Sequence, residues 1–182
     1  MRHSTERRTI IAGGVFAVMA MTTLAGANVG GLRINVTPSM PRGLWRVVTE
    51  DGPRHDGEIV AVCPPDTPPV RLGAARGYIP PGSCPGGYEP IVKPIAATVG
   101  DIVTVSAAAV SVNGWPVPGT MLLTSDSAGR PLAPFPSGTY RVRPGQLWLL
   151  SGHDPRSFDS RYFGPVPTTN IQGVARPVWV AQ

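Results

Sequence analysis

The sequence predicts a mainly β protein that carries a single membrane helix at its N-terminus. Glycine and proline supply 22 residues each, and so many turn-forming residues argue against a helical bundle. Beyond the N-terminal segment, short apolar stretches are broken by turns, and none of them keeps a helical period over ten residues. A chain of 182 residues, 42% of them hydrophobic, has room for one domain and a short appendage.

The appendage is the N-terminal segment. Residues 1–8 form a basic cytoplasmic tail, and the 24 residues from Thr9 to Leu32 carry no charge. A helix of that length, at about 1.5 Å per residue, spans the roughly 30 Å hydrocarbon core of a bilayer. Because basic flanks stay in the cytoplasm, residues 9–32 predict a transmembrane signal-anchor in the inner (cytoplasmic) membrane. Residues 33–182 then form a periplasmic domain.

A cleaved signal peptide is the competing interpretation of the same segment. Ile10–Leu24 is a usable apolar region, and Ala25-Gly26-Ala27 has the small-residue pattern of a cleavage site. We favour the retained anchor. Both interpretations export the remainder of the chain.

The predicted strands begin after the anchor. Leu44–Val48 and Glu58–Val62 are apolar stretches, and Asp51-Gly52-Pro53 supplies the turn residues between them. Glu89–Ala96 and Asp101–Val105 follow as a second pair around a glycine-containing turn.

A hairpin is the strongest local signal in the second half of the chain. Asn113-Gly114, the dipeptide that suits a type I′ turn, joins Ala109–Val112 to Trp115–Val117. Residues 125–138 are polar and contain glycine and proline, which predicts a surface loop. Further strands are predicted at Thr139–Val142, Gln146–Leu150 and Val174–Val180.

Cys63 and Cys84 are the only cysteines. An even number in an exported chain predicts one disulfide. It would close the Pro/Gly-rich loop 63–84 and contribute about 3 kcal/mol in the chain-entropy model. A pair of free thiols is the alternative. Neither cysteine lies in a metal-ligand spacing, and we predict neither a metal nor a cofactor.

The net positive charge of the chain raises the question of a nucleic-acid partner. The net charge of +5 comes from arginines that are spread along the sequence. Nucleic-acid binding calls for a basic face with aromatic or motif support, and the sequence contains neither. We therefore predict a solvated basic surface and no nucleic-acid partner.

The first candidate catalytic residue is Ser39, which lies in the stretch Val36–Trp45 just past the apolar segment. A serine hydroxyl is a poor nucleophile at its own pKa and needs a base that accepts its proton. Its position alone does not identify a nucleophile, so the base decides the interpretation.

Lys93 is the candidate base. It is the only lysine, against fifteen arginines, and a buried lysine can lose its proton whereas arginine cannot. It lies in an apolar, strand-like stretch, where desolvation can lower a lysine pKa from about 10.4 by about 3 to 5 pKa units. The alternative is compositional: a bias toward arginine leaves few lysines, and the remaining one has no special role.

A third stretch, Ser151–Val166, follows a predicted strand and is rich in small polar residues. Asp159 and Arg161 lie two apart in it, and side chains two apart on an extended segment share a face. We therefore expect an ion pair between them. Taken alone, the stretch also fits a polar loop held by a salt bridge.

Together, the three stretches resemble the signal peptidase I family of Ser/Lys proteases. In that family a Ser-Met pair follows the anchor, a lysine precedes a Gly-Asp turn, and a Gly-Asp-Asn…Ser-x-Asp-Ser-Arg segment closes the site. This chain has Ser39-Met40, Lys93 ahead of Gly100-Asp101, and Gly152–Arg161. The resemblance is tight in these blocks and loose elsewhere, and it implies a fold of coiled antiparallel sheets.

The resemblance implies a role for each matching residue. Ser39 would be the nucleophile and Lys93 its general base, and Ser157 would hydrogen-bond the lysine amine and orient it. The backbone N–H of Ser39 and the hydroxyl of Thr37 would form the oxyanion hole. A well-aimed donor in such a hole matters by about 10²-fold or more in rate.

Asp159 and Arg161 match an ion pair that supports the site in the family. Among its conjugative-transfer members the aspartate has been regarded as a third catalytic residue, so Asp159 is either participant or scaffold. We favour the scaffold role because a carboxylate close to Lys93 would raise the lysine pKa and oppose deprotonation.

The last block departs from the family pattern. Gly152-His153-Asp154 stands where the family has Gly-Asp-Asn, and the spacing to Ser157 is one residue shorter. A Ser-His-Asp triad that uses His153 or His55 is therefore a rival mechanism. Because His153 lies in the same loop as Asp159, a role in turn structure is the simpler interpretation.

The chain is most similar to the conjugative-transfer members of the family in its compact size, its short anchor and the residues around Ser39. That resemblance implies that the partner is an exported precursor protein at the membrane, a conjugative pilin, which is cleaved and in that branch also joined into a ring. A general leader peptidase is one alternative. A non-catalytic, membrane-anchored β module of an envelope assembly is the other.

Overall fold

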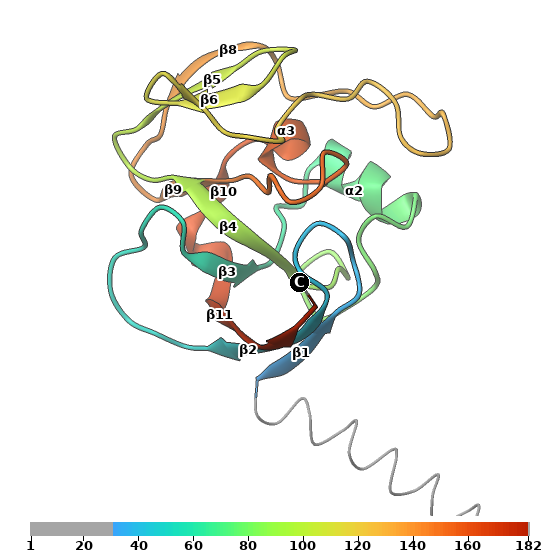
Figure 1. The fold of residues 1–182 in the computed structure, drawn as a ribbon, viewed down its shortest axis with the longest axis vertical. Coiled ribbons are helices and arrows are strands. Elements are labelled where there is room, and N and C mark those ends of the chain that lie inside the picture. The colour runs from blue at the N-terminus through green and yellow to red at the C-terminus, as the bar shows by residue number, and fades with distance from the viewer. Residues whose placement is uncertain (1–30, 182) are drawn as a thin grey trace, which may run out of the picture.

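The computed structural model describes residues 31–181. They form two antiparallel sheets, a small one at one end of the domain and a large one at the other (Figure 1). The predicted mainly β class is confirmed. Apart from Gly31 and Leu32, the predicted anchor lies outside the described residues, as does the basic tail. Within residues 31–181, no helix has the length and apolar character needed to cross a membrane.

The large sheet contains seven strands in the order β1-β2-β11-β3-β4-β9-β10, and the small sheet contains four in the order β7-β6-β5-β8. The strands are β1 (Leu32–Asn35), β2 (Gly43–Val48), β3 (Ile59–Val62), β4 (Ile91–Ala97), β5 (Ile102–Val105), β6 (Val110–Val112), β7 (Trp115–Pro116), β8 (Gly138–Arg141), β9 (Gln146–Leu149), β10 (Val166–Pro167) and β11 (Ile171–Val180). The helices are α2 (Pro68–Ala75), α3 (Ser160–Phe163) and the 3-10 turn η1 (Thr168–Asn170).

β11 joins the two halves of the large sheet because it pairs with two strands. Val174 lies opposite Val48 of β2 on one side and opposite Val60 of β3 on the other. This pairing places the C-terminal strand in the middle of the sheet and leaves β1 at its edge, paired with β2. β4 lies inside the sheet, between β3 and β9.

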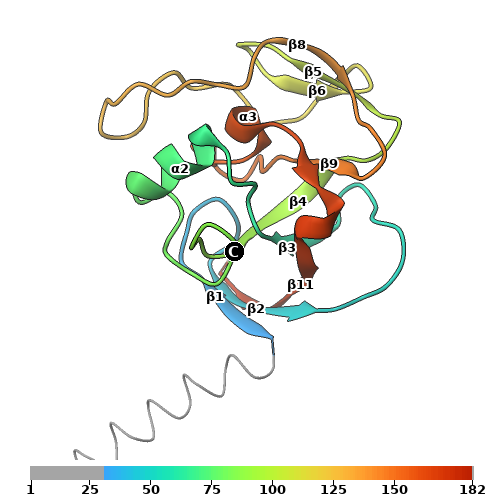
Figure 2. The ribbon, with the colours of Figure 1, turned by 180° about the vertical axis from the view of Figure 1, so that it is seen from behind.

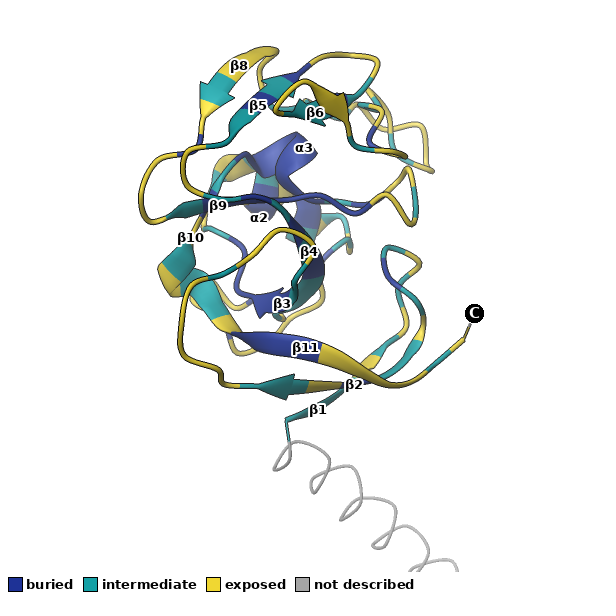
Figure 3. Ribbon diagram, turned by 60° about the vertical axis from the view of Figure 1, so that its left-hand side comes forward, coloured by how far each residue is buried: buried dark blue, intermediate teal, exposed yellow. Residues whose placement is uncertain are grey.

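Alternation along β9 explains why the domain has two apolar clusters. Leu147 and Leu149 pack into the cluster of the large sheet, whereas Trp148 and the following Leu150 pack into the cluster beneath the small sheet. Successive side chains of a strand point to opposite faces, so one short strand supports both cores. Figure 3 shows the buried strands β3 and β9 between the two ends of the domain.

The predicted hairpin is confirmed. β6 and β7 pair antiparallel, and Asn113 and Gly114 have φ values of 51° and 85°, as the two central residues of a type I′ turn require. The Asn113 side chain also accepts a hydrogen bond from the Ile102 amide at 2.9 Å and donates to Asp101 at 2.7 Å, which fixes the turn against β5. The predicted surface loop over residues 125–138 is also present, up to the start of β8.

The predicted disulfide between Cys63 and Cys84 is present, but the loop that it closes is more regular than the sequence indicates. It contains α2, which begins with two prolines, Pro68 and Pro69, at its N-terminus, where they need not donate a backbone hydrogen bond. α2 lies beside α3 in both views of the fold (Figures 1 and 2). A Cβ at Gly73 would meet the Phe158 ring at 2.8 Å, so glycine permits this approach.

Candidate active site

Ser39 lies in the connection between β1 and β2, which we call the serine turn (residues 36–42). Met40 of this turn is buried, and the Trp45 indole donates to the Pro41 carbonyl at 3.1 Å. The side chain of Ser39 is half-buried, and its Oγ lies 3.1 Å from Oγ1 of Thr37. The buried side chains of Met40 and Trp45 therefore hold the serine turn against the core.

Lys93 occupies the middle of β4, with Val60 of β3 as its cross-strand partner. Lys93, Ile95 and Ala97 alternate as the buried positions of the strand, which is why the lysine side chain points inward. Only 3% of Lys93 is exposed, and its Nζ donates to Oγ of Ser157 at 2.8 Å. The contact expected between Lys93 and Ser157 is therefore present.

Burial sets the protonation of this lysine. The pKa of Lys93 falls from 10.5 to about 8: desolvation is the largest cause and the Arg161 guanidinium acts in the same direction, whereas Asp159 and Asp154 oppose the shift. Removing a cation from water disfavours its charged form more than these two carboxylates favour it. A larger share of Lys93 is thus neutral near pH 8 than of a lysine in water.

Asp159 and Arg161 form the expected ion pair, with both side chains fully buried. The arginine Nε and Nη2 donate to the two carboxylate oxygens, each at 2.8 Å. The prediction that both residues lie on an extended segment was wrong, however, because a helical turn begins between them. Asp159 is the N-cap of α3 and accepts from the Arg161 amide at 3.2 Å, so the pair forms at the start of a helical turn.

Arg161 also holds together several backbone segments around the site. Its guanidinium donates to the carbonyls of Gly119, Ser151 and Pro155 at 3.0 to 3.1 Å. The backbone at Pro118 and Gly119 lies close to Gly152. A Cβ at Gly152 would lie 2.2 Å from the Pro118 carbonyl oxygen. The glycine in this block is therefore required by backbone packing.

Ser151 belongs to the site, although the sequence did not single it out. It lies at the start of the closing loop, which we define as residues 151–159. Its amide donates to Asp159 Oδ2 at 3.0 Å, and its hydroxyl donates to the backbone carbonyl of Ser39. The ion pair, the closing loop and the serine turn are thereby connected. Nothing in the sequence around Ser151 indicates a contact with a residue 112 positions away.

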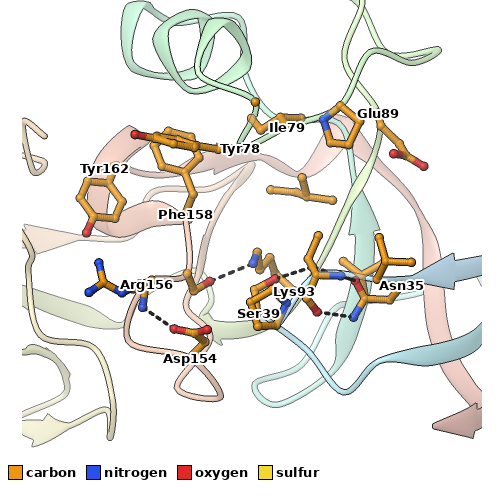
Figure 4. Close-up of a pocket in the computed structure, with 18 of the residues that line it drawn as sticks. Asn35, Ser39, Tyr78, Ile79, Glu89, Lys93, Asp154, Arg156, Phe158 and Tyr162 are labelled. Carbon is orange, nitrogen blue, oxygen red and sulfur yellow. Dashed lines mark hydrogen bonds between the residues drawn. The ribbon is translucent and has the colours of Figure 1, made fainter. Parts of the chain in front are cut away.

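Ser39, Lys93 and Ser157 line one cleft of about 420 Å³. Thr37 also lines it, whereas the Asp159–Arg161 pair lies buried behind it. Figure 4 shows Ser39 and Lys93 together in this cleft, with the aromatic side chains of the far wall, Tyr78, Phe158 and Tyr162. Neither His55 nor His153 lines the cleft, so the rival Ser-His-Asp triad has no support in the described part of the chain.

The matches to known proteins agree with this arrangement. The family model for "Signal peptidase, peptidase S26" matches residues 4–180. The chain therefore belongs to this peptidase family.

Particular relatives are similar over most of their length. A probable conjugal transfer protein TraF of Sinorhizobium fredii is 43% identical over 87% of this chain and 82% of that protein. The conjugal transfer protein TraF of Agrobacterium fabrum is 42% identical over 90% and 93%. A plasmid transfer protein TraF of Escherichia coli is 38% identical over 94% and 96%. A signal peptidase I structure from Enterococcus faecalis aligns with 69% of this chain and 98% of that one, at 21% identity and a TM-score of 0.39.

Proposed function

We propose that this chain is a membrane-anchored serine endopeptidase that processes exported precursor proteins, with Ser39 as nucleophile and Lys93 as general base. One observation carries the proposal: a fully desolvated lysine lines the same cleft as Ser39 and has its amine held by Ser157 at 2.8 Å. With a pKa of about 8, about one Lys93 side chain in ten is neutral at pH 7. That fraction suffices for a base whose work is to accept a serine proton.

The proposed reaction has two halves. Ser39 Oγ attacks the scissile carbonyl while its proton passes to the neutral Nζ of Lys93. The Ser39 amide and the Thr37 hydroxyl stabilise the oxyanion. The C–N bond then breaks, the leaving amine takes the proton from Lys93, and an ester remains on Ser39. An incoming water or amine reverses these proton transfers and frees the serine.

Asp159 acts as scaffold in this mechanism. Both of its carboxylate oxygens are engaged, by Arg161 and by the amide of Ser151. The charge of Asp159 raises the pKa of Lys93, which opposes the formation of the base. Its contribution is to hold the closing loop against the serine turn.

The substrate binds as an extended strand along the cleft. β1 is an edge of the large sheet, and its residues Arg33–Asn35 line the cleft together with Ile91–Lys93 of β4. Extended peptides commonly add to the edge of a sheet as a further strand. Only six positions separate Arg33 from Ser39, which at about 3.6 Å per residue places the serine within roughly 20 Å of a retained anchor.

The relatives named for conjugal and plasmid transfer favour a specialised substrate. We propose that it is the precursor of a conjugative pilin, presented at the inner membrane from the periplasmic side. An acyl-enzyme can be resolved by water, which releases a linear product, or by the amine of the same chain, which closes a ring. The second outcome differs from the first by the mass of one water.

The test is incubation of a pilin precursor with purified parent, Ser39→Ala and Lys93→Arg proteins. The proposal expects processing by the parent alone, since arginine keeps the charge but cannot serve as a base. Ser106→Ala, at an exposed serine in the connection between β5 and β6, is the matched control and should process normally. Equal processing by parent and Ser39→Ala would remove Ser39 from the mechanism. The mass of the product then separates cleavage from ring closure.

Deletion of the gene separates this specialist from the two alternatives. Loss of conjugation with normal secretion supports the specialist, whereas a broad failure of secretion supports a general leader peptidase. Full complementation by the Lys93→Arg chain would support a non-catalytic envelope module, because such a module does not need a neutral amine at position 93.

A further inference from the structure

Asn35, the last residue of β1, makes an unusual set of contacts with the serine turn. Its Nδ2 donates to the carbonyls of Thr37, Met40 and Pro41 at 3.1, 2.9 and 3.1 Å. Its Oδ1 accepts from the amide of Thr37 at 3.1 Å and from the Thr37 hydroxyl at 2.8 Å. A single half-buried carboxamide therefore organises the backbone on both sides of Ser39.

The orientation of this carboxamide follows from its partners. Its oxygen faces a backbone N–H, which can only donate, and its nitrogen faces three carbonyls, which can only accept. Rotating the amide by half a turn would set donor against donor and acceptor against acceptor. Oδ1 is therefore the atom that the Thr37 hydroxyl meets, and the hydroxyl must donate to it.

The direction of the next hydrogen bond follows in turn. A threonine hydroxyl has one proton, and Thr37 gives it to Asn35. In the 3.1 Å contact between Thr37 Oγ1 and Ser39 Oγ, Ser39 is therefore the donor in the resting state, and its O–H bond must turn toward Lys93 Nζ before that base can accept the proton. Asn35 thus sets the direction of a chain of hydrogen bonds that runs from the serine through the threonine to the carboxamide.

This arrangement fixes where the Thr37 oxygen lies. Because Asn35 Oδ1 holds both the amide and the hydroxyl of Thr37, the χ1 rotamer of the threonine is set before a substrate arrives. Donation to an oxyanion then requires only that the O–H bond turn away from Asn35, without a change of rotamer. Donors that are placed in advance do not have to be reorganised during the reaction.

We propose that Asn35 is a positioning residue: it fixes the serine turn and holds the Thr37 hydroxyl where it can switch from Asn35 to the oxyanion. This inference rests on the proposed function. It assigns Asn35 a role that acts through Thr37, and the two residues should therefore be coupled in their effect on kcat.

The experiment is a double-mutant cycle on peptide cleavage with Asn35→Leu, which is close in size but forms no hydrogen bonds, and Thr37→Val. Asn35→Leu should lower kcat by about 10- to 100-fold and change KM by less than about threefold. In the Thr37→Val background the same substitution should lower kcat by less than about threefold, because the hydroxyl that it positions is absent. Asn170→Ala, which removes a side-chain contact with the Cys63 carbonyl, should match the parent.

Two outcomes overturn the inference: an unchanged kcat in Asn35→Leu, or a loss of the same size with and without the Thr37 hydroxyl. If Asn35→Leu does not melt cooperatively, Asn35→Asp takes its place, since it keeps the acceptor for Thr37 and loses the donors to the three carbonyls. The same coupling criterion then applies. Ser39→Ala runs in parallel: if it remains active, the proposed function fails, whereas an inactive Ser39→Ala beside an unaffected Asn35 variant rejects only the role of Asn35.

Discussion

The hydroxyl of Ser151 donates to the backbone carbonyl of Ser39, across 112 positions of sequence. The amide of the same serine donates to Asp159. The residue that carries the proposed nucleophile is therefore tied to the buried ion pair through one intermediate residue. This connection explains how a pair that does not line the cleft can still determine the geometry within it.

Replacing Ser151 by alanine should weaken that connection. We expect the free energy of unfolding to fall by about 1 kcal/mol, as for the loss of one hydrogen bond. We expect kcat to fall by about tenfold, because the backbone of the serine turn is less well fixed for attack. Chemical denaturation and steady-state kinetics measure the two effects. Ser106→Ala is the control, and a Ser151→Ala protein with the kcat of the parent would contradict the positioning role.

The activity should depend on pH through Lys93. Its pKa is about 8, and the base is the neutral form, so kcat/KM should rise about tenfold per pH unit below pH 8 and level off above it. The ascending limb of the kcat/KM profile reports the pKa of the base in the free enzyme. A profile measured between pH 6 and 9 that stays flat would show that no group with this pKa acts as the base.

The same desolvation should make Lys93 unfavourable for stability. Its pKa is lower in the folded protein than the usual 10.5, so the folded state binds fewer protons between about pH 8 and 10.5. The stability contribution of this residue therefore rises with pH across that window and is lowest below pH 8.

Lys93→Met should consequently stabilise the protein while abolishing activity. The pKa difference corresponds to at most about 3 kcal/mol at pH 7, and the gain over the parent should shrink as the pH approaches 10. Thermal unfolding at several pH values measures it. Arg46→Met, at an exposed position of β2, controls for the loss of a positive charge. A Lys93→Met protein that is less stable than the parent at pH 7 would contradict the expectation.

The parts of the fold and site that depend on local chemistry could be predicted from the sequence. The turn at Asn113-Gly114 requires positive φ at both residues, and that requirement is visible in the dipeptide. The burial of Lys93 followed from the apolar residues of its own strand. The Asp159–Arg161 pair was found from its spacing, although the spacing was interpreted with the wrong backbone conformation.

The missed features depend on contacts that the sequence does not display. α2 is a helix of only eight residues, too short for a periodic signal and flanked by prolines and glycines that indicate a loop. At Gly73 the helix packs closely against the ring of Phe158, a residue far away in the sequence. Ser151 and Asn35 are ordinary polar residues locally, and they acquire their roles only when the closing loop and the serine turn meet.

Asp159→Asn tests whether the aspartate is scaffold or participant. Because Asp159 raises the pKa of Lys93, removing its charge should shift the ascending limb of the pH profile to lower pH, while kcat at the plateau should fall by no more than the roughly tenfold loss expected of Ser151→Ala. Asp154→Asn should shift the limb in the same direction by less, since its influence on that pKa is smaller. A folded Asp159→Asn protein whose activity at every pH lies far below that of Ser151→Ala would identify a third catalytic residue. Stability should fall by about 3 kcal/mol, because Arg161 loses its buried partner.

Opening the Cys63–Cys84 disulfide should affect substrate binding more than chemistry. The segment that the disulfide closes, residues 63–84, contains Tyr78 and Arg76. The Tyr78 hydroxyl donates to Asp126, and Arg76 donates to the Pro131 carbonyl at 2.7 Å. These contacts join the segment to the 125–138 loop, and Tyr78 and Asp126 line the cleft. Ser39 and Lys93 lie on other elements.

The double variant Cys63→Ser/Cys84→Ser should therefore lose about 3 kcal/mol of stability, as the 21-residue separation predicts in the chain-entropy model. Its KM should rise several-fold while kcat stays within about threefold of the parent, because the cleft wall loosens and the Ser39–Lys93 geometry does not. Reductant should reproduce both changes in the parent and have no effect on the double variant. A fall in kcat at constant KM would show instead that the disulfide supports the reacting groups, and the wall would then have no separate part in binding.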